Sequence, residues 1–581
     1  MKYLILIITV VSFRATTLAQ SAHVSRDLVT AEWTDAKMDV IVRYWHQPNE
    51  LQHRRVANFG GRLKKQLRLI NGESYTVSAS SLEALAADPD VASIVPDRKV
   101  HMLLDNTAAA VNAAVAWNNY GLDGSGIGVA VIDSGISAHS DLQGANGIRI
   151  LFRDNFVGTD ANDHFGHGEH VAGIIAGNGG DSKCSICSRN FVGIAPNVNL
   201  IDLRVLDENG EGNDSAVIAA IDEAIQIRDQ YNIRVINLSL GRPVFESYQD
   251  DPLCQAVEAA WRAGIVVVVA AGNDGRVNVP NNNGYGTISS PGNDPYVITV
   301  GAMKSMGTLD RADDLIASYS SKGPTQIDHI VKPDILAPGN QVVSLRSPDA
   351  LLPVLYPQNG VPLNYYEWTQ EGQSSAAYFR LSGTSMAAPV VSGAAALLLQ
   401  LHPELTPDQV KARLMRTAYK QFPAVSTAFD SLTGQSFTSE YDVFTVGAGY
   451  LDIQAALADD NRFWGTAHSP RAFRTNSGSG LQGGASIVCD SGSICGYGWF
   501  FGWTLQSIWG DQSIWGDQSI WGDQSIWGDQ SIWGDQSIWG DQSIWGDQSI
   551  WGDQSIWGDQ SIWGDQSLLS FATSISVTGE Q

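Results

Sequence analysis

Three short stretches of the sequence place an aspartate, a histidine and a serine where apolar patterning alone would not predict polar side chains. Asp133 ends an apolar run, His167 lies between two glycines, and Ser385 precedes a long Ala- and Leu-rich run. A serine hydroxyl becomes a nucleophile at neutral pH when an imidazole takes its proton, and the imidazole works best when a carboxylate orients it. These residue types, in the order Asp, His, Ser, predict acyl transfer.

The elements around these residues predict an α/β fold with a mainly parallel sheet. Apolar runs without alternation are typical of strands covered on both faces. Such runs occur at 127–132, 199–206, 235–240, 265–271 and 296–300. Helical patterns lie between them at 214–227 and 253–263. This alternation indicates right-handed crossovers, with the active residues at the carboxyl ends of the strands.

Ser385 lies in the first turn of a predicted buried helix that continues to about residue 401. A helix start presents unpaired N–H groups and the positive end of the helix dipole, so a negative charge developing there would be stabilised. Taken alone, Ser385 would be interpreted as a cap of this helix. A further helix is predicted from Thr406, where Thr-Pro-Asp-Gln forms a capping box.

The chain resembles the subtilisin-like serine proteases, or subtilases. The resemblance is carried by Asp133-Ser134-Gly135, by 167–173 (HGEHVAG) and by 383–389 (GTSMAAP), and it covers about residues 106–460. It implies the α/β, three-layer fold of subtilisin with a mainly parallel sheet.

The same resemblance implies the role of each site residue. Asp133 would orient the imidazole, His167 would be the general base, and Ser385 would attack the peptide carbonyl. Asn273, which follows the strand predicted at 265–271, would donate to the oxyanion together with the backbone N–H of Ser385. Without the other three residues, Asn273 would be interpreted as part of a turn.

Two further segments resemble the substrate-binding strands of the family, where bare backbone lets an extended peptide pair as another strand. Their residues are Gly210, Gly212, Ser239, Leu240 and Gly241. The acidic Asp207, Glu208 and Glu211 nearby suggest tolerance for basic side chains in the substrate, although such residues usually point to water.

Three positions need separate interpretation. Glu169 stands where the family commonly has threonine, and we expect it to add charge beside the site. His170 is interpreted as structural, because the pair with His167 does not form the zinc-protease signature His-Glu-x-x-His. Asp141 matches a calcium ligand of some relatives, but one carboxylate does not make a site for an ion that takes six or more oxygens. No cofactor is expected to be required, and structural calcium is left open.

The composition and the amino terminus indicate a secreted, folded protein. At 581 residues the chain predicts two or three units, and its formal net charge of -25 excludes a general nucleic-acid binder. A Lys at position 2, an apolar run at 3–13 and the small residue Ala19 predict a secretory signal cleaved after Ala19. The alternative for this run is a buried first strand.

We therefore expect a propeptide-inhibited precursor with several parts. Segment 20–105 has predicted strands at 39–44 and 91–95 and a helix at 82–87, and it resembles the inhibitory propeptide of the family. We expect its removal near 98–106, by Ser385 itself. The expected order is signal peptide 1–19, propeptide 20–105, catalytic domain 106–460, linker 461–506, repeats 507–566 and C-terminal tail 567–581.

Five cysteines occur in the sequence. In an exported protein a local disulfide between Cys184 and Cys187 is favoured over a metal site, because no further Cys or His pair completes four ligands. Cys489 and Cys495 would close a hairpin loop, and Cys254, on an apolar helix face, is expected to be a buried free thiol.

The sequence Ser-Ile-Trp-Gly-Asp-Gln repeats ten times from Ser507 to Gln566. In an extended chain the even period would place Ile, Gly and Gln on one face and Trp, Asp and Ser on the other. A stacked β-solenoid and an unstructured tail are both left open. A second function hypothesis follows, in which the repeats make the protein a surface-attachment or binding protein that contacts the cell surface or glycan.

Overall fold

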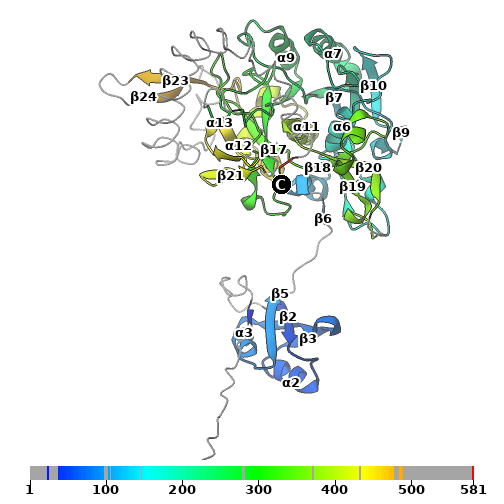
Figure 1. Ribbon diagram of the computed structural model, residues 1–581, viewed down its shortest axis with the longest axis vertical. Helices are drawn as coiled ribbons and strands as arrows, with labels where there is room; N and C mark the ends of the chain where they lie inside the picture. The colour runs from blue at the N-terminus through cyan, green and yellow to red at the C-terminus, as the bar shows by residue number, and fades with distance from the viewer. Residues whose placement is uncertain are drawn as a thin grey trace, which may run out of the picture. The chain divides into compact units, whose positions relative to one another are not determined.

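The structure, a computed structural model, describes residues 23–24, 37–96, 103–104, 106–145, 147–277, 282–368, 372–430, 433–476, 483–488 and 579–580. The chain divides into two compact units, Met1–His101 and Met102–Gln581, which are described separately (Figure 1). The predicted signal peptide, the pair Cys489 and Cys495, and the ten repeats lie outside the described residues.

The first unit is a five-stranded sheet with two helices. The strand order is β1-β5-β2-β4-β3, and every described pair is antiparallel except β1 with β5. The elements are β1 (His23–Val24), β2 (Lys37–Tyr44), α2 (Glu50–Asn58), β3 (Arg62–Leu67), β4 (Gly72–Ser78), α3 (Ala79–Ala86) and β5 (Val91–Pro96). Alternate side chains of β2 are buried in a core with Tyr75 and Ile94. The predicted strands and helix of this segment are therefore found.

The second unit is built on an eight-stranded sheet in the order β10-β12-β7-β13-β14-β15-β16, with β17 also paired to β15. All pairs are parallel except β15 with β16. The strands are β7 (Gly128–Asp133), β10 (Ile150–Asn155), β12 (Asn199–Arg204), β13 (Ile233–Leu238), β14 (Val266–Ala270), β15 (Ile298–Lys304), β16 (Leu315–Ile316) and β17 (Ile335–Pro338). Every residue of β7 and β14 is buried, as strands covered on both faces require.

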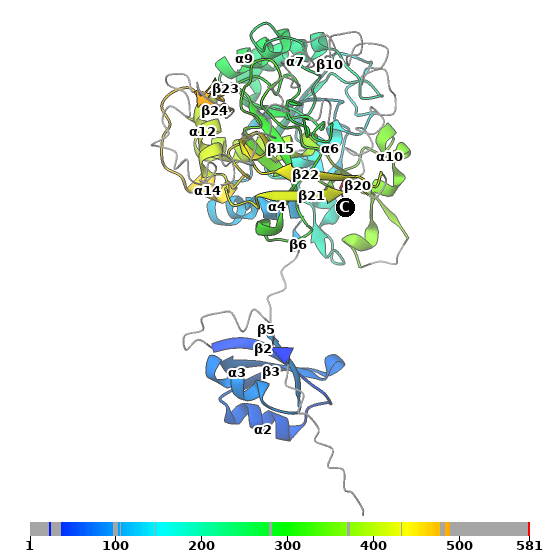
Figure 2. The ribbon, with the colours of Figure 1, turned by 60° about the vertical axis from the view of Figure 1, so that its left-hand side comes forward.

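Helices pack on this sheet. Helices α6 (Gly168–Ala176) and α11 (Thr384–Leu401) contact each other, and α11 runs along β13, β14 and β15. Helices α7 (Asp214–Gln226) and α9 (Pro252–Arg262) contact each other and the sheet, and they lie together at the top of the unit in Figure 1 and in Figure 2. The order helix, sheet, helix agrees with the predicted architecture.

The long helix α11 forms the centre of the core. Its length and apolar composition match those of a membrane span, but 83% of that window is buried inside the unit, so it is a core helix. Helix α12 (Pro407–Thr417) begins with the predicted capping box, because Thr406 and Gln409 exchange side-chain and backbone hydrogen bonds. Strand β20 (Ser374–Leu381) leads directly into the turn that carries Ser385.

Shorter elements complete the second unit. They are β6 (Leu103–Leu104), α4 (Asn106–Ala110), α5 (Ala113–Val115), β8 (Gln143–Gly144), β9 (Gly147–Ile148), β11 (Arg189–Asn190), α8 (Arg228–Tyr231), β18 (Val342–Leu345), α10 (Leu351–Leu355), β19 (Gly360–Pro362), β21 (Val425–Phe429), β22 (Ser436–Glu440), α13 (Val443–Val446), α14 (Ile453–Ala458), β23 (Arg471–Asn476) and β24 (Gly483–Val488).

The described residues after 460 also pack on this unit. Phe463 and Ala467 are buried against α12, and the hydroxyl of Ser469 contacts Lys411 and Asp334. The start of the segment that we expected to be a linker is therefore part of the packed unit.

Candidate active site

Asp133 and His167 form a direct pair at the carboxyl end of the sheet. Asp133 is the last residue of β7 and is fully buried. Its Oδ1 lies 2.7 Å from Nδ1 of His167 and accepts the N–H of Ser134 over 2.8 Å. The histidine precedes α6, and its side chain keeps 15% of its surface exposed. The imidazole of His167 thus contacts a buried carboxylate and keeps part of its surface open to solvent.

Glycine is required on both sides of this pair. Gly135 has φ +107°, in the left-handed region that favours glycine. A Cβ on Gly168 would lie 2.2 Å from the carbonyl oxygen of Gly135. The turn after β7 and the start of α6 therefore touch through their backbones, which brings Asp133 and His167 together.

Asp163, which the sequence analysis did not single out, connects the two segments. Its Oδ1 accepts the hydroxyl of Ser134 (2.8 Å) and the N–H of Gly166 (2.7 Å), and its Oδ2 accepts the N–H of Glu169 (2.8 Å). The Ser134 hydroxyl in turn accepts the N–H of Gly168 (2.9 Å). Asp163 thus caps α6 from the preceding loop. The sequence signal for such a role is an acidic residue shortly before the start of a helix.

These charges raise the pKa of His167 above its ordinary value of 6.5. Burial by itself lowers this pKa, but the charge of Asp133, the hydrogen bond to Asp133 and the charge of Asp163 together outweigh burial. Burial raises the pKa of Asp163 itself, although hydrogen bonds from the N–H groups of Glu169 and Gly166 and from the Ser134 hydroxyl oppose this shift.

Glu169 does not add the charge that we expected. The side chain is fully buried, and its Oε2 accepts the N–H of Ser137. Burial, followed by the charge of Asp163, raises the pKa of Glu169 well above its usual range, which favours the neutral acid. Helix α6 turns this side chain into the interior beside Asp202.

His170 is structural, as expected. Its Nε2 lies 3.1 Å from the carbonyl oxygen of Val342 and 3.2 Å from that of Phe379. Burial, with a contribution from His167, lowers the pKa of His170 to about 3. The side chain is therefore a neutral link between α6 and the strands β18 and β20.

Ser385 is the second residue of α11 and is partly exposed. Its carbonyl oxygen accepts the hydroxyl of Ser239 over 2.7 Å. Within the helix this oxygen would bond to the N–H of residue 389, but that residue is a proline. The Ser239 hydroxyl also accepts Nδ2 of Asn237, whose Oδ1 accepts the hydroxyl of Ser392 on the same helix. A buried polar chain thus fixes the start of α11 to the end of β13.

Asn273 lies beside the same helix start, in the loop after β14. Its Oδ1 accepts the N–H of Thr384 over 2.8 Å and the hydroxyl of Thr384 over 3.1 Å. A Cβ on Gly383 would lie 3.3 Å from Nδ2 of Asn273. Because Oδ1 is used by Thr384, the amide Nδ2 is the group of Asn273 that remains to donate to a ligand at Ser385.

The predicted substrate-binding residues lie in the segments that follow the two strands flanking β7. Gly210 and Gly212 follow β12, and Ser239 to Gly241 follow β13; both strands pair with β7. A Cβ on Gly210 would lie 2.6 Å from the ring of Phe165, and one on Gly212 would lie 2.3 Å from the carbonyl oxygen of Val205. Of the nearby acids, Asp207 accepts the N–H groups of its own loop, whereas Glu208 and Glu211 are exposed.

Both carboxylate oxygens of Asp141 accept hydrogen bonds from protein groups. Oδ1 accepts the N–H of Asp181 (2.8 Å) and Oδ2 accepts the hydroxyl of Tyr378 (2.7 Å). Among the described His, Cys, Asp and Glu side chains, His139 is the other one within ligand reach of Asp141 and Asp181, and these three side chains alone do not supply the six to eight oxygens that calcium takes. In the described part of the chain, protein donors therefore occupy the carboxylate that the resemblance pointed to.

The cysteines that the structure describes behave as the sequence predicted. Cys184 and Cys187 form a disulfide, and Cys254 is a buried free thiol.

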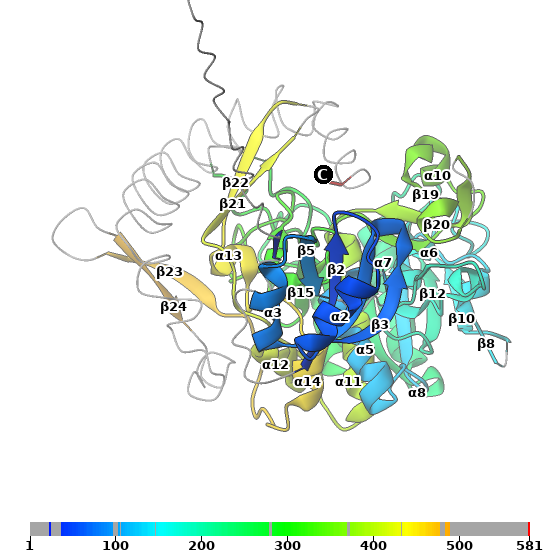
Figure 3. The same cartoon turned by 90° about the horizontal axis from the view of Figure 1, so that it is seen from below.

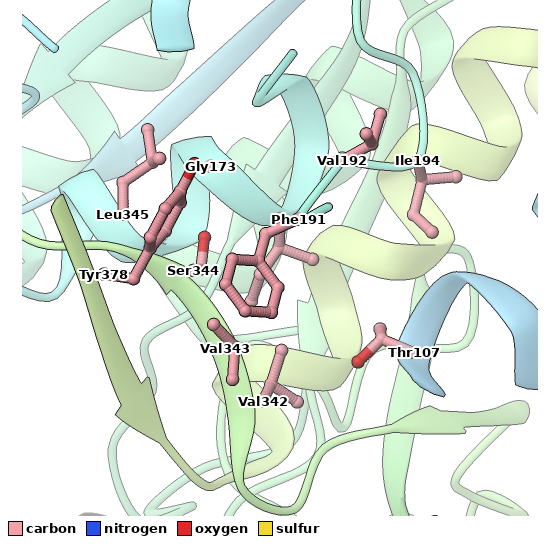
Figure 4. A pocket seen from close by; sticks show the side chains of 12 residues that line it. Thr107, Gly173, Phe191, Val192, Ile194, Val342, Val343, Ser344, Leu345 and Tyr378 are labelled. Carbon is pink, nitrogen blue, oxygen red and sulfur yellow. The ribbon is translucent and has the colours of Figure 1, made fainter. Parts of the chain in front are cut away.

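A small pocket next to α6, shown in Figure 4, is lined by side chains that include Thr107, Phe191 and Tyr378. None of the predicted site residues lines this pocket.

Comparison with known proteins agrees with this geometry. The profile of the subtilase family matches residues 124–443. Serine protease AprX of Bacillus subtilis (strain 168) is 40% identical over 362 residues, which are 61% of this chain and 75% of AprX. Subtilisin E of the same strain is 34% identical over 407 residues, covering 69% and 84% of the two chains. The subtilisin of Bacillus pumilus is 36% identical over 347 residues, covering 59% and 95%. The chain belongs to the subtilase family and is a subtilisin-like serine protease.

Proposed function

We propose that this endopeptidase cleaves peptide bonds with Ser385 as nucleophile, His167 as general base and Asp133 as the carboxylate that orients His167. The observation that carries the proposal is the 2.7 Å contact between Asp133 Oδ1 and His167 Nδ1. A carboxylate at Nδ1 holds the imidazole proton on that nitrogen, which leaves Nε2 as the base.

In this mechanism the Ser385 hydroxyl oxygen attacks the carbonyl carbon while its proton passes to Nε2 of His167. The tetrahedral intermediate collapses when the amine leaves with that proton, and an acyl-serine ester remains. Water then attacks the ester, gives a proton to His167, and the carboxylic acid product leaves as Ser385 regains its proton. Nδ2 of Asn273 and the N–H of Ser385 are proposed to donate to the oxyanion, where the start of α11 adds its dipole.

The substrate is proposed to bind as an extended strand. Gly210 and Gly212 would supply one edge, and Ser239, Leu240 and Gly241 the other. The two exposed acids, Glu208 and Glu211, favour basic side chains in the substrate. Comparison of kcat/KM for peptides with Lys or Arg at successive positions against matched apolar peptides tests this preference; equal values at every position would contradict it.

Residues 20–105 are proposed to be an inhibitory propeptide. Support comes from the compact fold of the first unit, its neutral composition beside an acidic second unit, and the membership of the chain in a family that includes subtilisin E. We propose that Ser385 cuts near 98–106. Expression of the Ser385→Ala chain alone tests this step, because self-cleavage predicts that this chain stays at full length; maturation of the variant would contradict it.

Secretion is proposed from the apolar run at 3–13 and from Ala19. The alternative, a surface-attachment protein whose repeats carry the main role, has no support in the comparisons, and its repeats lie outside the described residues.

A fluorophosphonate probe tests the catalytic assignment. We expect the probe to label Ser385 in the mature enzyme and to fail with Ser385→Ala and His167→Ala. Ser426→Ala, a change on the hairpin β21–β22, is the matched control and should label as the parent does. A probe attached to any other residue would contradict the assignment.

A further inference from the structure

The last described residues of the chain, Gly579 and Glu580, are packed into the second unit. The Glu580 side chain is only 4% exposed, although its partners Ser318 and Arg276 lie 262 and 304 residues earlier in the sequence. The C label in Figure 2 and Figure 3 marks this end of the chain, near the hairpin β21–β22 and strand β20.

The Glu580 carboxylate has dedicated partners. Its Oε1 accepts the N–H of Ser318 (2.8 Å), the Ser318 hydroxyl and Nη2 of Arg276 (2.8 Å). Arg276 is itself 9% exposed, stacks over the ring of Phe437 at 4.5 Å and also binds Asp430 over 3.0 Å. The position is thus built to bind an acidic side chain.

The main chain of Glu580 is bound as specifically as its side chain. The N–H of Glu580 donates to Oδ1 of Asn340 (2.8 Å), and Nδ2 of Asn340 donates to the Glu580 carbonyl oxygen (2.9 Å). Nε2 of Gln341 donates to the same oxygen over 3.1 Å. The Asn340 amide therefore pairs with one residue of peptide backbone as a neighbouring strand would.

Only glycine fits before this glutamate. Gly579 has φ +72°, and a Cβ on it would lie 2.3 Å from Oγ of Ser382 and 2.9 Å from Cγ of Gln341. We call the site that binds Gly579 and Glu580 the C-terminal slot; it is formed by Arg276, Ser318, Asn340, Gln341 and Ser382. The slot distinguishes a Gly-Glu sequence by charge, by backbone pairing and by close contact.

The slot is formed in part by segments that also carry proposed catalytic residues. Ser382, which contacts Gly579, is three residues before Ser385, and its hydroxyl accepts the N–H of Gln341 over 2.8 Å. Arg276 is three residues after Asn273. Gly579 and Glu580 therefore contact two segments that also carry site residues.

We propose that the C-terminal slot is a binding site for a Gly-Glu peptide segment and that its natural occupant is the chain's own Gly579–Glu580. The tail that contains the repeats is then attached to the protease unit at both ends, through β24 and through Glu580.

Hydrogen exchange on the full chain with Ser385→Ala, which prevents self-digestion, tests the docking. The N–H of Ser318 donates to Glu580, so in the added variant Glu580→Ala we expect its exchange to be at least about tenfold faster, as loss of a charged hydrogen bond implies. Glu580→Gln keeps Oε1 as an acceptor while it removes the charge and replaces the other oxygen with an amide nitrogen, so a smaller acceleration is expected. Glu246→Ala, which removes an exposed glutamate, should leave Ser318 unchanged. Unchanged exchange in Glu580→Ala would overturn the proposal.

A peptide added in trans tests recognition without relying on how the variants fold. A labelled peptide with the sequence of residues 575–581 is titrated into the Glu580→Ala, Ser385→Ala chain, with fluorescence anisotropy as the measurement. Peptides that carry Val for the glycine or Gln for the glutamate should bind at least about tenfold more weakly. Equal binding of all three peptides, or no binding of the parent peptide, would overturn the assignment. Neither readout depends on catalysis, so failure here is separate from failure of the proposed mechanism.

Discussion

The hydroxyl of Ser239 donates to the main-chain oxygen of Ser385 over 2.7 Å, across 146 residues of sequence. The helix cannot satisfy this oxygen itself, because Pro389 lies four residues later and has no N–H. A side chain from the end of β13 therefore replaces a helix hydrogen bond next to the proposed nucleophile.

Ser239→Ala should lower the free energy of unfolding by about 1–3 kcal/mol, because it leaves a carbonyl group without a partner. In a chain that also carries Pro389→Ala, residue 389 regains an N–H that can donate to the main-chain oxygen of Ser385. Ser239→Ala should then lower the free energy of unfolding by less. Urea unfolding of the inhibitor-treated enzymes measures both costs. Equal costs in the two backgrounds would show that the proline and the Ser239 bond are not linked.

The acidic limb of the pH profile of kcat/KM should have its midpoint above 6.5. The base must be neutral to accept a proton, and Asp133 and Asp163 favour the charged imidazole, which raises the pKa of His167. Asp163→Asn should move the midpoint to lower pH, whereas Asp160→Asn, at an exposed position, should leave it in place. A midpoint below 6.5 in the parent enzyme would contradict the charge balance described for this site.

Asn273→Ala should lower kcat with little change in KM, because the lost donor acts on charge that develops in the transition state. The expected loss is about 10²- to 10³-fold, a magnitude taken from subtilisin, where an oxyanion-hole asparagine has this effect. Steady-state kinetics on a peptide substrate measures the loss. Asn461→Ala, at an exposed position away from the site, is the control; a similar loss there, or none in Asn273→Ala, would remove Asn273 from the mechanism.

Glu169→Gln should stabilise the enzyme at alkaline pH. The pKa of Glu169 is raised in the folded state. Above the unfolded-state pKa of about 4.5, the carboxyl group ionises in the unfolded chain but not in the folded chain. At such pH values the group therefore destabilises the fold. Each pKa unit corresponds to about 1.4 kcal/mol. The melting temperature of Glu169→Gln should match the parent at pH 4 and exceed it at pH 8. A gain that is independent of pH would contradict this account.

Removal of divalent metal should leave the region of Asp141 unchanged. Both carboxylate oxygens of Asp141 already accept hydrogen bonds, from Asp181 and Tyr378. We therefore expect that hydrogen exchange of residues 139–142 and 180–183 is the same with excess chelator as with millimolar calcium. Tyr378→Phe, which removes one donor, should accelerate exchange in both conditions. Faster exchange with chelator alone would show that an ion binds there.

The fold was predictable where local patterns decide it. The uninterrupted valines of β14 and the capping box at Thr406 specify their elements without help from distant residues. The fifth of the predicted strands, at 296–300, begins instead at Ile298, because Asp294 accepts the N–H of Tyr296 and holds that residue in a bend. A side-chain hydrogen bond of this kind is not visible as periodicity.

The residues of the candidate site also fall into those that local sequence predicts and those that it does not. Asp133, His167 and Ser385 stand in recognisable motifs, and the structure places each at an element end, as the sequence suggests. The roles of Asp163 and Ser239 depend on which loops meet in space, and a single sequence does not show that. The burial of Glu169 is also not visible in a single sequence, because a charged residue type does not show that its face of the helix lies in the interior.

The docking of Glu580 has a consequence for the number of hexapeptide copies. The hydrogen bonds that hold Glu580 join it to Arg276, Ser318, Asn340 and Gln341, all of which precede the repeats in the sequence. Copies can therefore be gained or lost by unequal duplication with almost no effect on how the C-terminus binds, so the length of this array is free to drift between chains that share the same protease unit.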